Sequence, residues 1–168
     1  MELEEFNALG EPAAADVVRP CVEIDSFVET VVAGRPYADL ESLLSTAAAQ
    51  TDGWTPAEVE RALAGHPRIG ERVAGSGLSA RLARREQSGV DQEDAAVLER
   101  LQEGNRRYEE TFGRIYLVRA AGRSAEELLA LLEKRLGNDP ETELQVTKEQ
   151  LGEIALLRLE RLFGEEAQ

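Results

Sequence analysis

Apolar side chains recur at spacings of three and four residues through most of the chain, a pattern that predicts a succession of amphipathic helices. The first clear stretch covers residues 25–33, and Gly34 and Pro36 directly after it are typical helix terminators. Further helices are predicted over residues 39–50, 55–64, 79–88, 91–111, 124–136 and 139–163. We therefore predict an all-α fold, a single-domain bundle of about seven to nine helices spanning residues 1–168.

Several of these helices begin with residues that can cap a helix N-terminus. Thr55-Pro56-Ala57-Glu58 combines a capping box with a proline at the first helical position, and Ser124 and Glu127 form a second box. Asp39 and Asp91 precede the helices that they are expected to cap. These local signals predict where the helices begin without reference to any long-range contact.

Two stretches depart from the helical pattern. Residues 65–77 begin with Gly65-His66-Pro67-Arg68-Ile69-Gly70. Because proline disfavours helix at the residue before it, we predict a loop that leaves the C-terminus of a helix. The other stretch, Ile115-Tyr116-Leu117-Val118, is apolar but has no helical period. A buried strand, a buried helix turn and an extended segment all fit it, and periodicity alone does not decide among them.

Composition narrows the function classes. The 168 residues include 33 acidic and 19 basic side chains, a formal net charge of −14. This charge argues against nonspecific nucleic-acid binding, which needs a basic surface. No apolar run approaches the roughly 20 residues of a membrane-spanning helix, so we expect no membrane insertion. The acidic N-terminus lacks the features of a signal peptide, and we expect a cytoplasmic protein.

A single cysteine and a single histidine limit the chemistry further. Cys21 has no second cysteine with which to form an intramolecular disulfide, and we expect it to be a small buried residue. One cysteine and one histidine do not make a typical zinc site, so no metal is expected. His66 is then the one imidazole available for acid–base chemistry near neutral pH.

The charge is uneven around His66. Residues 65–90 contain five arginines and two glutamates within an otherwise acidic protein, as capture of a small anion would require. Glu86 is a candidate partner for His66, since a neighbouring carboxylate would orient the imidazole and stabilise its charged form. The alternatives are a surface-loop histidine without a role and a solvated arginine face, with Glu86 paired to an arginine.

Other residues have simpler interpretations. Trp54 is expected to pack in the core, and the Ser124 hydroxyl is expected to bond backbone as an N-cap rather than act as a nucleophile. Arg158 lies among apolar residues of the last predicted helix, so its guanidinium either reaches water or is held toward a site. The glycines form no nucleotide-binding pattern.

Short motifs in a fixed order resemble one known family. The sharpest are His66-Pro67-Arg68-Ile69-Gly70 and Arg85-Glu86-Gln87-Ser88-Gly89. The others are, in chain order, Phe6-Asn7, Arg35-Pro36-Tyr37, Asn105, Tyr108, Phe112-Gly113, Arg135-Leu136, Glu143-Leu144 and Ile154–Leu159. Together they cover nearly the whole chain, and in this order and spacing the sequence resembles the 2-oxo-4-hydroxy-4-carboxy-5-ureidoimidazoline (OHCU) decarboxylases of urate degradation.

The resemblance implies a cofactor-free, all-helical decarboxylase, usually a homodimer, that converts its small anionic ureidoimidazoline substrate to (S)-allantoin. By position, His66 matches the family's catalytic histidine and Glu86 the carboxylate beside it. Residues 116–120 match a segment that lines the site, partly through backbone groups. The candidate substrate-binding residues are Pro67, Ala83, Arg84, Arg85, Gln87, Tyr116, Leu117, Val118, Arg119, Ala120 and Arg158.

One position departs from the family pattern. Ala83 stands where the family often has serine, so one hydrogen bond to the substrate is expected to be missing or replaced by water. This departure keeps open a paralogue that acts on another ureido or imidazole acid. An alternative from a different class is a non-catalytic helical module that binds a partner through its apolar faces.

Overall fold

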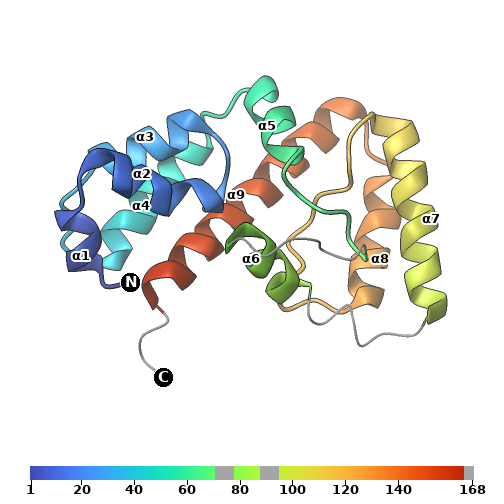
Figure 1. Cartoon of the computed structure of the whole chain (residues 1–168). Helices are drawn as coiled ribbons and strands as arrows, with labels where there is room; N and C mark the ends of the chain where they lie inside the picture. The colour runs from blue at the N-terminus through green and yellow to red at the C-terminus, as the bar shows by residue number, and fades with distance from the viewer. Residues whose placement is uncertain (71–77, 88–94, 165–168) are drawn as a thin grey trace. The chain divides into compact units, whose positions relative to one another are not determined.

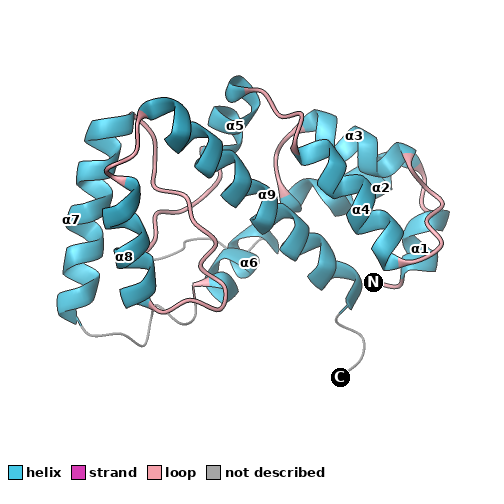
Figure 2. Cartoon of the chain, turned by 180° about the vertical axis from the view of Figure 1, so that it is seen from behind, coloured by secondary structure: helices cyan, strands magenta, loops and turns pink. Residues whose placement is uncertain are grey.

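Residues 1–70, 78–87 and 95–164 are the part of the chain that the computed structural model describes. Within these ranges every regular element is a helix, nine α-helices and one short 3-10 helix (Figures 1 and 2). The predicted all-α class is therefore confirmed. The predicted N-cap Asp91 lies outside the described residues. So do Arg72, one of the five arginines in residues 65–90, and Ser88, the last residue of the predicted 79–88 helix.

The chain divides into two compact units. Residues 1–62 and 152–168 form what we call the terminal unit, and residues 63–151 form the central unit. The long helix α9 (Pro140–Gly164) supplies residues to both units. Each unit buries its own set of apolar side chains.

The terminal unit is built mainly from short helices. They are α1 (Leu3–Ala8), α2 (Glu11–Val18), the 3-10 helix η1 (Arg19–Cys21), α3 (Asp25–Ala33), α4 (Leu40–Thr51) and α5 (Pro56–Leu63), whose last residue begins the central unit. The bounds of α3, α4 and α5 agree with the predicted stretches to within one residue. The sequence pattern predicts no helix before residue 25, because α1, α2 and η1 each bury only one or two side chains and are too short to show a period.

Helix caps in the terminal unit form as predicted. The Asp39 Oδ1 accepts a hydrogen bond from the Ser42 backbone N–H at 2.8 Å. Thr55 and Glu58 form the complete capping box: Thr55 Oγ1 accepts from the Glu58 N–H at 3.2 Å, and the Glu58 carboxylate accepts from the Thr55 N–H at 3.0 Å. These contacts fix the starts of α4 and α5.

Two of the motifs that support the resemblance meet inside the terminal unit. The Asn7 side chain exchanges two hydrogen bonds with the Tyr37 backbone, donating to its carbonyl at 2.9 Å and accepting from its N–H at 2.8 Å. Arg35 Nη1 donates to the carbonyls of Phe6 at 2.8 Å and Leu9 at 2.7 Å. Because these bonds join the N-terminal segment to the turn after α3, both motifs have a structural role.

The central unit contains α6 (Leu78–Glu86), α7 (Ala95–Phe112), α8 (Ala125–Arg135) and the first part of α9. Helices α7 and α8 lie side by side (Figure 1). They approach closely at Gly104, where an added Cβ would lie 2.3 Å from Leu132 Cδ2. Ser124 Oγ accepts from the Glu127 N–H at 3.2 Å, which confirms Ser124 as the N-cap of α8.

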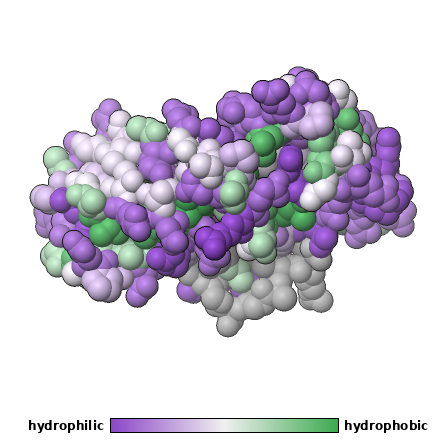
Figure 3. All heavy atoms as spheres, turned by 90° about the horizontal axis from the view of Figure 1, so that it is seen from above, coloured by the Kyte–Doolittle hydropathy of each residue, from purple (hydrophilic) through white to green (hydrophobic). Residues whose placement is uncertain are grey.

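Apolar side chains of the described residues are largely buried. Met1 is the only large hydrophobic residue among them that is exposed, and hydrophilic side chains surround small apolar patches on the face seen in Figure 3. Trp54 packs edge-on against Phe27 with ring centroids 5.8 Å apart, and Cys21 is buried, as the sequence predicts for both. In the described ranges no helix is long and apolar enough to cross a membrane.

Candidate active site

The loop that contains His66 follows α5 and is attached to α7. The His66 backbone N–H donates to the Leu63 carbonyl at 3.0 Å and so continues the end of α5. Further along the loop, the Ile69 carbonyl accepts a hydrogen bond from Asn105 Nδ2 at 2.9 Å, and Asn105 is itself buried on α7. The His66 side chain is partly exposed. These contacts hold the loop backbone, and His66 keeps part of its surface exposed.

A hydrogen bond also connects this loop to the end of α6. The Gly70 N–H donates to Gln87 Oε1 at 3.2 Å. Gly70 has a φ of +83°, a conformation that favours glycine. Gln87 directly follows Glu86, and only 7% of its surface is exposed. The contact brings the residue after Glu86 against the loop that contains His66, whereas the pairing of His66 with Glu86 stays a prediction.

The residues predicted to bind an anion differ in their surroundings. Arg68 forms an ion pair with Glu109 of α7, with Nη2 3.3 Å from Oε2. Arg84 and Arg85, in the last turn of α6, are exposed. Ala83 is buried and offers only a methyl group at its position. Contact between these α6 residues and a substrate stays a prediction.

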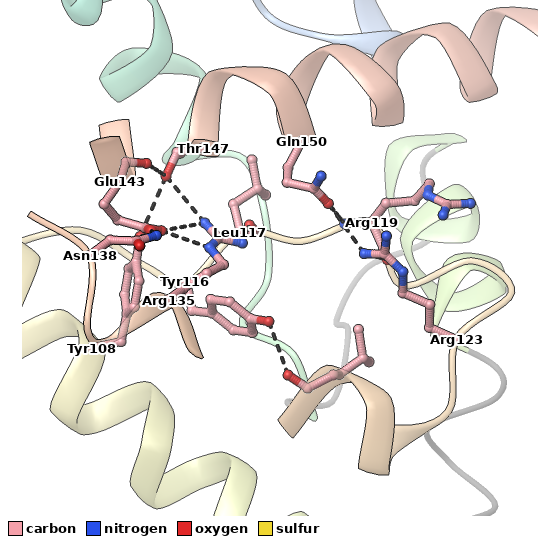
Figure 4. A network of polar contacts seen from close by, with 11 residues as sticks. Tyr108, Tyr116, Leu117, Arg119, Arg123, Arg135, Asn138, Glu143, Thr147 and Gln150 are labelled. Carbon is pink, nitrogen blue, oxygen red and sulfur yellow. Dashed lines mark hydrogen bonds and ion pairs between the residues drawn. The ribbon is translucent and has the colours of Figure 1, made fainter. Parts of the chain in front are cut away.

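Residues 115–120 form neither a helix nor a strand. Of the three interpretations of this apolar run, the buried strand and the helix turn are therefore wrong. Side chains of α8 and α9 hold the segment (Figure 4). Arg135 Nη1 donates to the Leu117 carbonyl at 2.7 Å, and Gln150 Oε1 accepts from the Arg119 N–H at 2.9 Å. These side chains bind backbone groups of the segment that a neighbouring strand would bind in a β-sheet.

A buried polar network surrounds Arg135. Its Nε donates to Glu143 Oε1 at 2.8 Å, and the same carboxylate oxygen accepts from the Tyr108 hydroxyl at 2.6 Å (Figure 4). Asn138 Nδ2 donates to the other oxygen of Glu143 at 3.0 Å, and Arg135 Nη2 donates to Thr147 Oγ1 at 3.3 Å. Burial, with the hydrogen bond to Glu143 as the next cause, raises the pKa of Tyr108.

The hydrophobic pattern and the motifs of the sequence do not predict this network. Arg135 and Glu143 occur among the family motifs, but spacing alone does not show that two charged residues from successive helices are both buried. Gln150 and Asn105 also hold proposed site segments without a predicted role of their own. The sequence signal that could have indicated these residues is the presence of polar side chains within otherwise apolar helix faces.

Arg158 belongs to the terminal unit and is 4% exposed. Its Nη1 donates to the Pro20 carbonyl at 3.2 Å and lies 3.5 Å from the Cys21 carbonyl. The interpretation in which the guanidinium reaches water is therefore wrong. A role of Arg158 in substrate binding stays a prediction.

A cavity of about 290 Å³ adjoins the His66 loop. Its lining residues are Arg68, Ile69, Gln102, Asn105, Arg106 and Glu109. In the part of the chain that the structure describes, none of the predicted catalytic or substrate-binding residues lines it. The same part of the chain contains no cluster of three or more histidine, cysteine, aspartate or glutamate side chains that could hold a metal ion.

The chain matches one known family along most of its length. The model of the OHCU decarboxylase family matches residues 7–160, a range that includes parts of both units. The chain belongs to the OHCU decarboxylase family. The resemblance inferred from the sequence motifs is thereby confirmed.

Individual members of this family are similar over nearly their full length. A 2-oxo-4-hydroxy-4-carboxy-5-ureidoimidazoline decarboxylase from Amia calva is 30% identical over 169 residues, covering 97% of this chain and 95% of that protein. The Mus musculus protein of the same name is 29% identical over 167 residues, covering 98% and 94%. A crystal structure of an OHCU decarboxylase in the presence of (S)-allantoin matches with a TM-score of 0.75 and 25% identity, covering 89% of this chain and 99% of that one.

Proposed function

We propose that this OHCU decarboxylase family member converts 2-oxo-4-hydroxy-4-carboxy-5-ureidoimidazoline to (S)-allantoin. Two relatives that cover nearly the whole chain have this decarboxylase name, and a matching crystal structure was obtained with (S)-allantoin. Within this chain, the observation that supports the proposal is the hydrogen bond from Gly70 to Gln87, because it attaches the His66 loop to the end of α6 where Glu86 lies. The bond joins the two segments that contain the proposed catalytic residues, His66 and Glu86.

The substrate supplies the electron sink for decarboxylation. When the bond to the carboxylate breaks, its electron pair moves into the adjacent ring imine, carbon dioxide leaves, and an enamine forms. A proton delivered to one face of the enamine carbon, with loss of the proton of the adjacent hydroxyl as it becomes the ring carbonyl, then gives a single enantiomer. The chemistry requires no pyridoxal, thiamine or metal, so the protein's tasks are to bind the polar groups, orient the breaking bond and place the proton.

His66 is the proposed proton donor, and Glu86 is the proposed group that orients it. Gln87 is proposed to read the ureido or ring amides of the substrate through its Nε2 donor and its Oε1, which accepts from Gly70 and has a second lone pair. Arg158 is proposed to bind substrate oxygens. Pro67, Ala83, Arg84, Arg85 and residues 116–120 complete the proposed binding set.

Two further properties belong to this proposal. A homodimer and a cytoplasmic location fit the family resemblance and the composition. The expected partner is the small anionic substrate, and we expect neither nucleic acid nor a membrane as a partner. Sedimentation of the purified protein tests the dimer directly, because a monomer at concentrations used for catalysis would contradict it.

The decisive experiment generates the unstable substrate in place from urate with the two upstream enzymes and follows the chirality of the allantoin. The proposal expects faster formation of (S)-allantoin when this protein is added. Unaccelerated racemic allantoin would contradict it. In that case, turnover of another ureido or imidazole acid would favour the paralogue, for which Ala83 is the motivating position, and no turnover at all would favour the binding module.

A further inference from the structure

The segment from Tyr116 to Ala120 has an unusual set of backbone bonds. It is flanked by α7 and α8, and as an irregular segment it lacks the repeating hydrogen bonds of a helix or a sheet. Tyr116, Leu117, Val118 and Ala120 are each at most 5% exposed. Buried backbone groups that lack a partner are costly, so a segment of this kind depends on side chains, water or a ligand.

Two side chains from other helices bind this segment at positions two residues apart. Arg135 of α8 donates from Nη1 to the Leu117 carbonyl at 2.7 Å, and Gln150 of α9 accepts from the Arg119 N–H at 2.9 Å (Figure 4). We call this pair of contacts the 117/119 clamp. No hydrogen bond to the backbone of the intervening residue, Val118, comes from the residues that the structure describes.

Of the two side chains in the 117/119 clamp, Gln150 is the one better suited to substitution. Its Oε1 also lies 3.4 Å from Arg123 Nη1, and that nitrogen donates to the Arg119 carbonyl at 3.2 Å. Both backbone polar groups of Arg119 are therefore held by a closed set of three side-chain contacts. The Gln150 side chain is only partly buried, and it makes no ion pair, so it can be changed with less damage than Arg135.

We propose that Gln150 is a positioning residue of the decarboxylation site: it fixes the Arg119 backbone so that the N–H and carbonyl of Val118 are presented to the substrate in a single orientation. This inference rests on the proposed function, in which residues 116–120 line the site. Fixed backbone donors and acceptors bind well only when their supports hold them within a fraction of an ångström. Gln150 does not contact the substrate in this scheme and acts through the segment.

Three variants separate this role from a general effect on folding. Gln150→Met keeps a similar side-chain volume but removes the acceptor, and Gln150→Glu keeps an oxygen at the same position. Gln145→Met is the matched control, because Gln145 lies one and a half turns earlier on α9, is exposed, and bonds only Glu149. Each variant is assayed for hydrogen exchange of the Arg119 amide, for the thermal midpoint, and for kcat and KM in the coupled assay.

For Gln150→Met we expect the Arg119 amide to exchange roughly tenfold faster, which is the effect of losing one ordinary hydrogen bond. We expect kcat/KM to fall by about the same factor, mostly through KM, because backbone contacts bind substrate and transition state alike. Gln150→Glu and Gln145→Met should keep both values. The changes in exchange rate and kcat/KM should appear well below the thermal midpoint. At such temperatures the variant is folded, so a loss of stability alone would not alter kcat or KM.

Either of two results overturns the inference. If the exchange rate of the Arg119 amide is unchanged in Gln150→Met, Gln150 does not hold the segment. If the amide exchanges faster while kcat and KM stay unchanged, the contact has no role in the site. Failure of the proposed function looks different, because the unmodified protein would then not accelerate (S)-allantoin formation. The exchange rates would still decide whether Gln150 fixes the segment.

Discussion

Arg135 and Glu143 form an ion pair in the interior of the central unit, with Arg135 Nη2 2.5 Å from Glu143 Oε1 and almost no exposure of either side chain. The guanidinium carbon of Arg135 also lies 4.8 Å from the centre of the Tyr116 ring. One buried cation therefore contacts both the carboxylate of α9 and the segment that we assign to the site. Its loss should affect stability and the position of that segment together.

We predict that Arg135→Met lowers the free energy of unfolding by about 3–5 kcal/mol, because it leaves the Glu143 carboxylate buried without its cation. The double variant Arg135→Met/Glu143→Leu should recover part of this loss, since it removes the uncompensated charge as well. Urea unfolding of the four proteins in the double-mutant cycle measures the coupling. Additive losses would show that the pair is energetically unimportant.

Alkaline pH should destabilise the protein. Burial is the main cause that raises the pKa of all three tyrosines, Tyr37, Tyr108 and Tyr116, above the ordinary value of 10.0. The folded state therefore keeps tyrosine protons that the unfolded state loses, so stability is full below about pH 10 and falls as the pH rises above it.

Unfolding free energies measured between neutral pH and the alkaline transition test this. Tyr116→Phe should be less stable near neutral pH, because the hydroxyl donates to the Leu128 carbonyl at 3.0 Å, but it should lose less stability above pH 10. A stability that stays level through the ionisation of free tyrosine, or a steeper loss in the Phe variant, would contradict the assignment.

His66→Asn should remove the acid–base group while leaving the loop in place. The backbone bond from His66 to Leu63 and the loop contacts through Ile69 do not involve the imidazole. We expect kcat for (S)-allantoin formation to fall roughly 10²- to 10⁴-fold, the usual contribution of general acid–base catalysis. The unfolding free energy should change by less than about 0.5 kcal/mol. A fully active variant would eliminate the proposed mechanism.

Two substitutions of Gln87 separate its structural contact from its proposed contact with substrate. Gln87→Glu keeps an oxygen that can accept from the Gly70 N–H but removes the Nε2 donor and adds negative charge near an anionic substrate. Gln87→Met removes the acceptor as well. We expect both to lower kcat/KM by about tenfold or more, while only Gln87→Met speeds exchange of the Gly70 amide. Normal activity in Gln87→Glu would exclude a donor role.

Gly104→Ala should be destabilising although alanine usually favours helices. Its Cβ would lie 2.3 Å from Leu132 Cδ2, so either the buried Leu132 side chain would have to move or α7 and α8 would have to separate, at a cost of about 1–3 kcal/mol. Gly164→Ala is the control, because nothing lies within 4 Å of the added Cβ near the end of α9. The thermal midpoints of both variants make the comparison. Equal midpoints would mean that the close approach is readily relieved.

Local chemistry predicted the larger part of the helical structure. The starts of α4, α5 and α8 depend on side chains within three residues of the helix start, so the sequence contains all the necessary information. Residues 115–120 are different, because their conformation depends on Arg135 and Gln150. These partners lie 18 and 31 residues away from the backbone groups that they bind, which no periodicity records.

The residues of the candidate site could likewise be predicted from the sequence, but their contacts could not. Motifs in the sequence indicated His66, Glu86 and Gln87, but not that Gln87 has its oxygen bound to Gly70. Some motif residues support the fold instead, as Asn7 does for Tyr37. Identity to a family motif therefore marks a residue that matters, and the contacts decide whether it matters for the fold or for the ligand.

The division of the chain into two units also provides it with separate intrinsic reporters. The one tryptophan, Trp54, is buried against Phe27 in the terminal unit, whereas the one histidine, His66, lies in the central unit. Tryptophan fluorescence and the imidazole proton resonance thus each follow a different unit, without labelling or assignment. If both signals change at the same urea concentration, the two units unfold as one cooperative system, and if they separate, one unit outlasts the other.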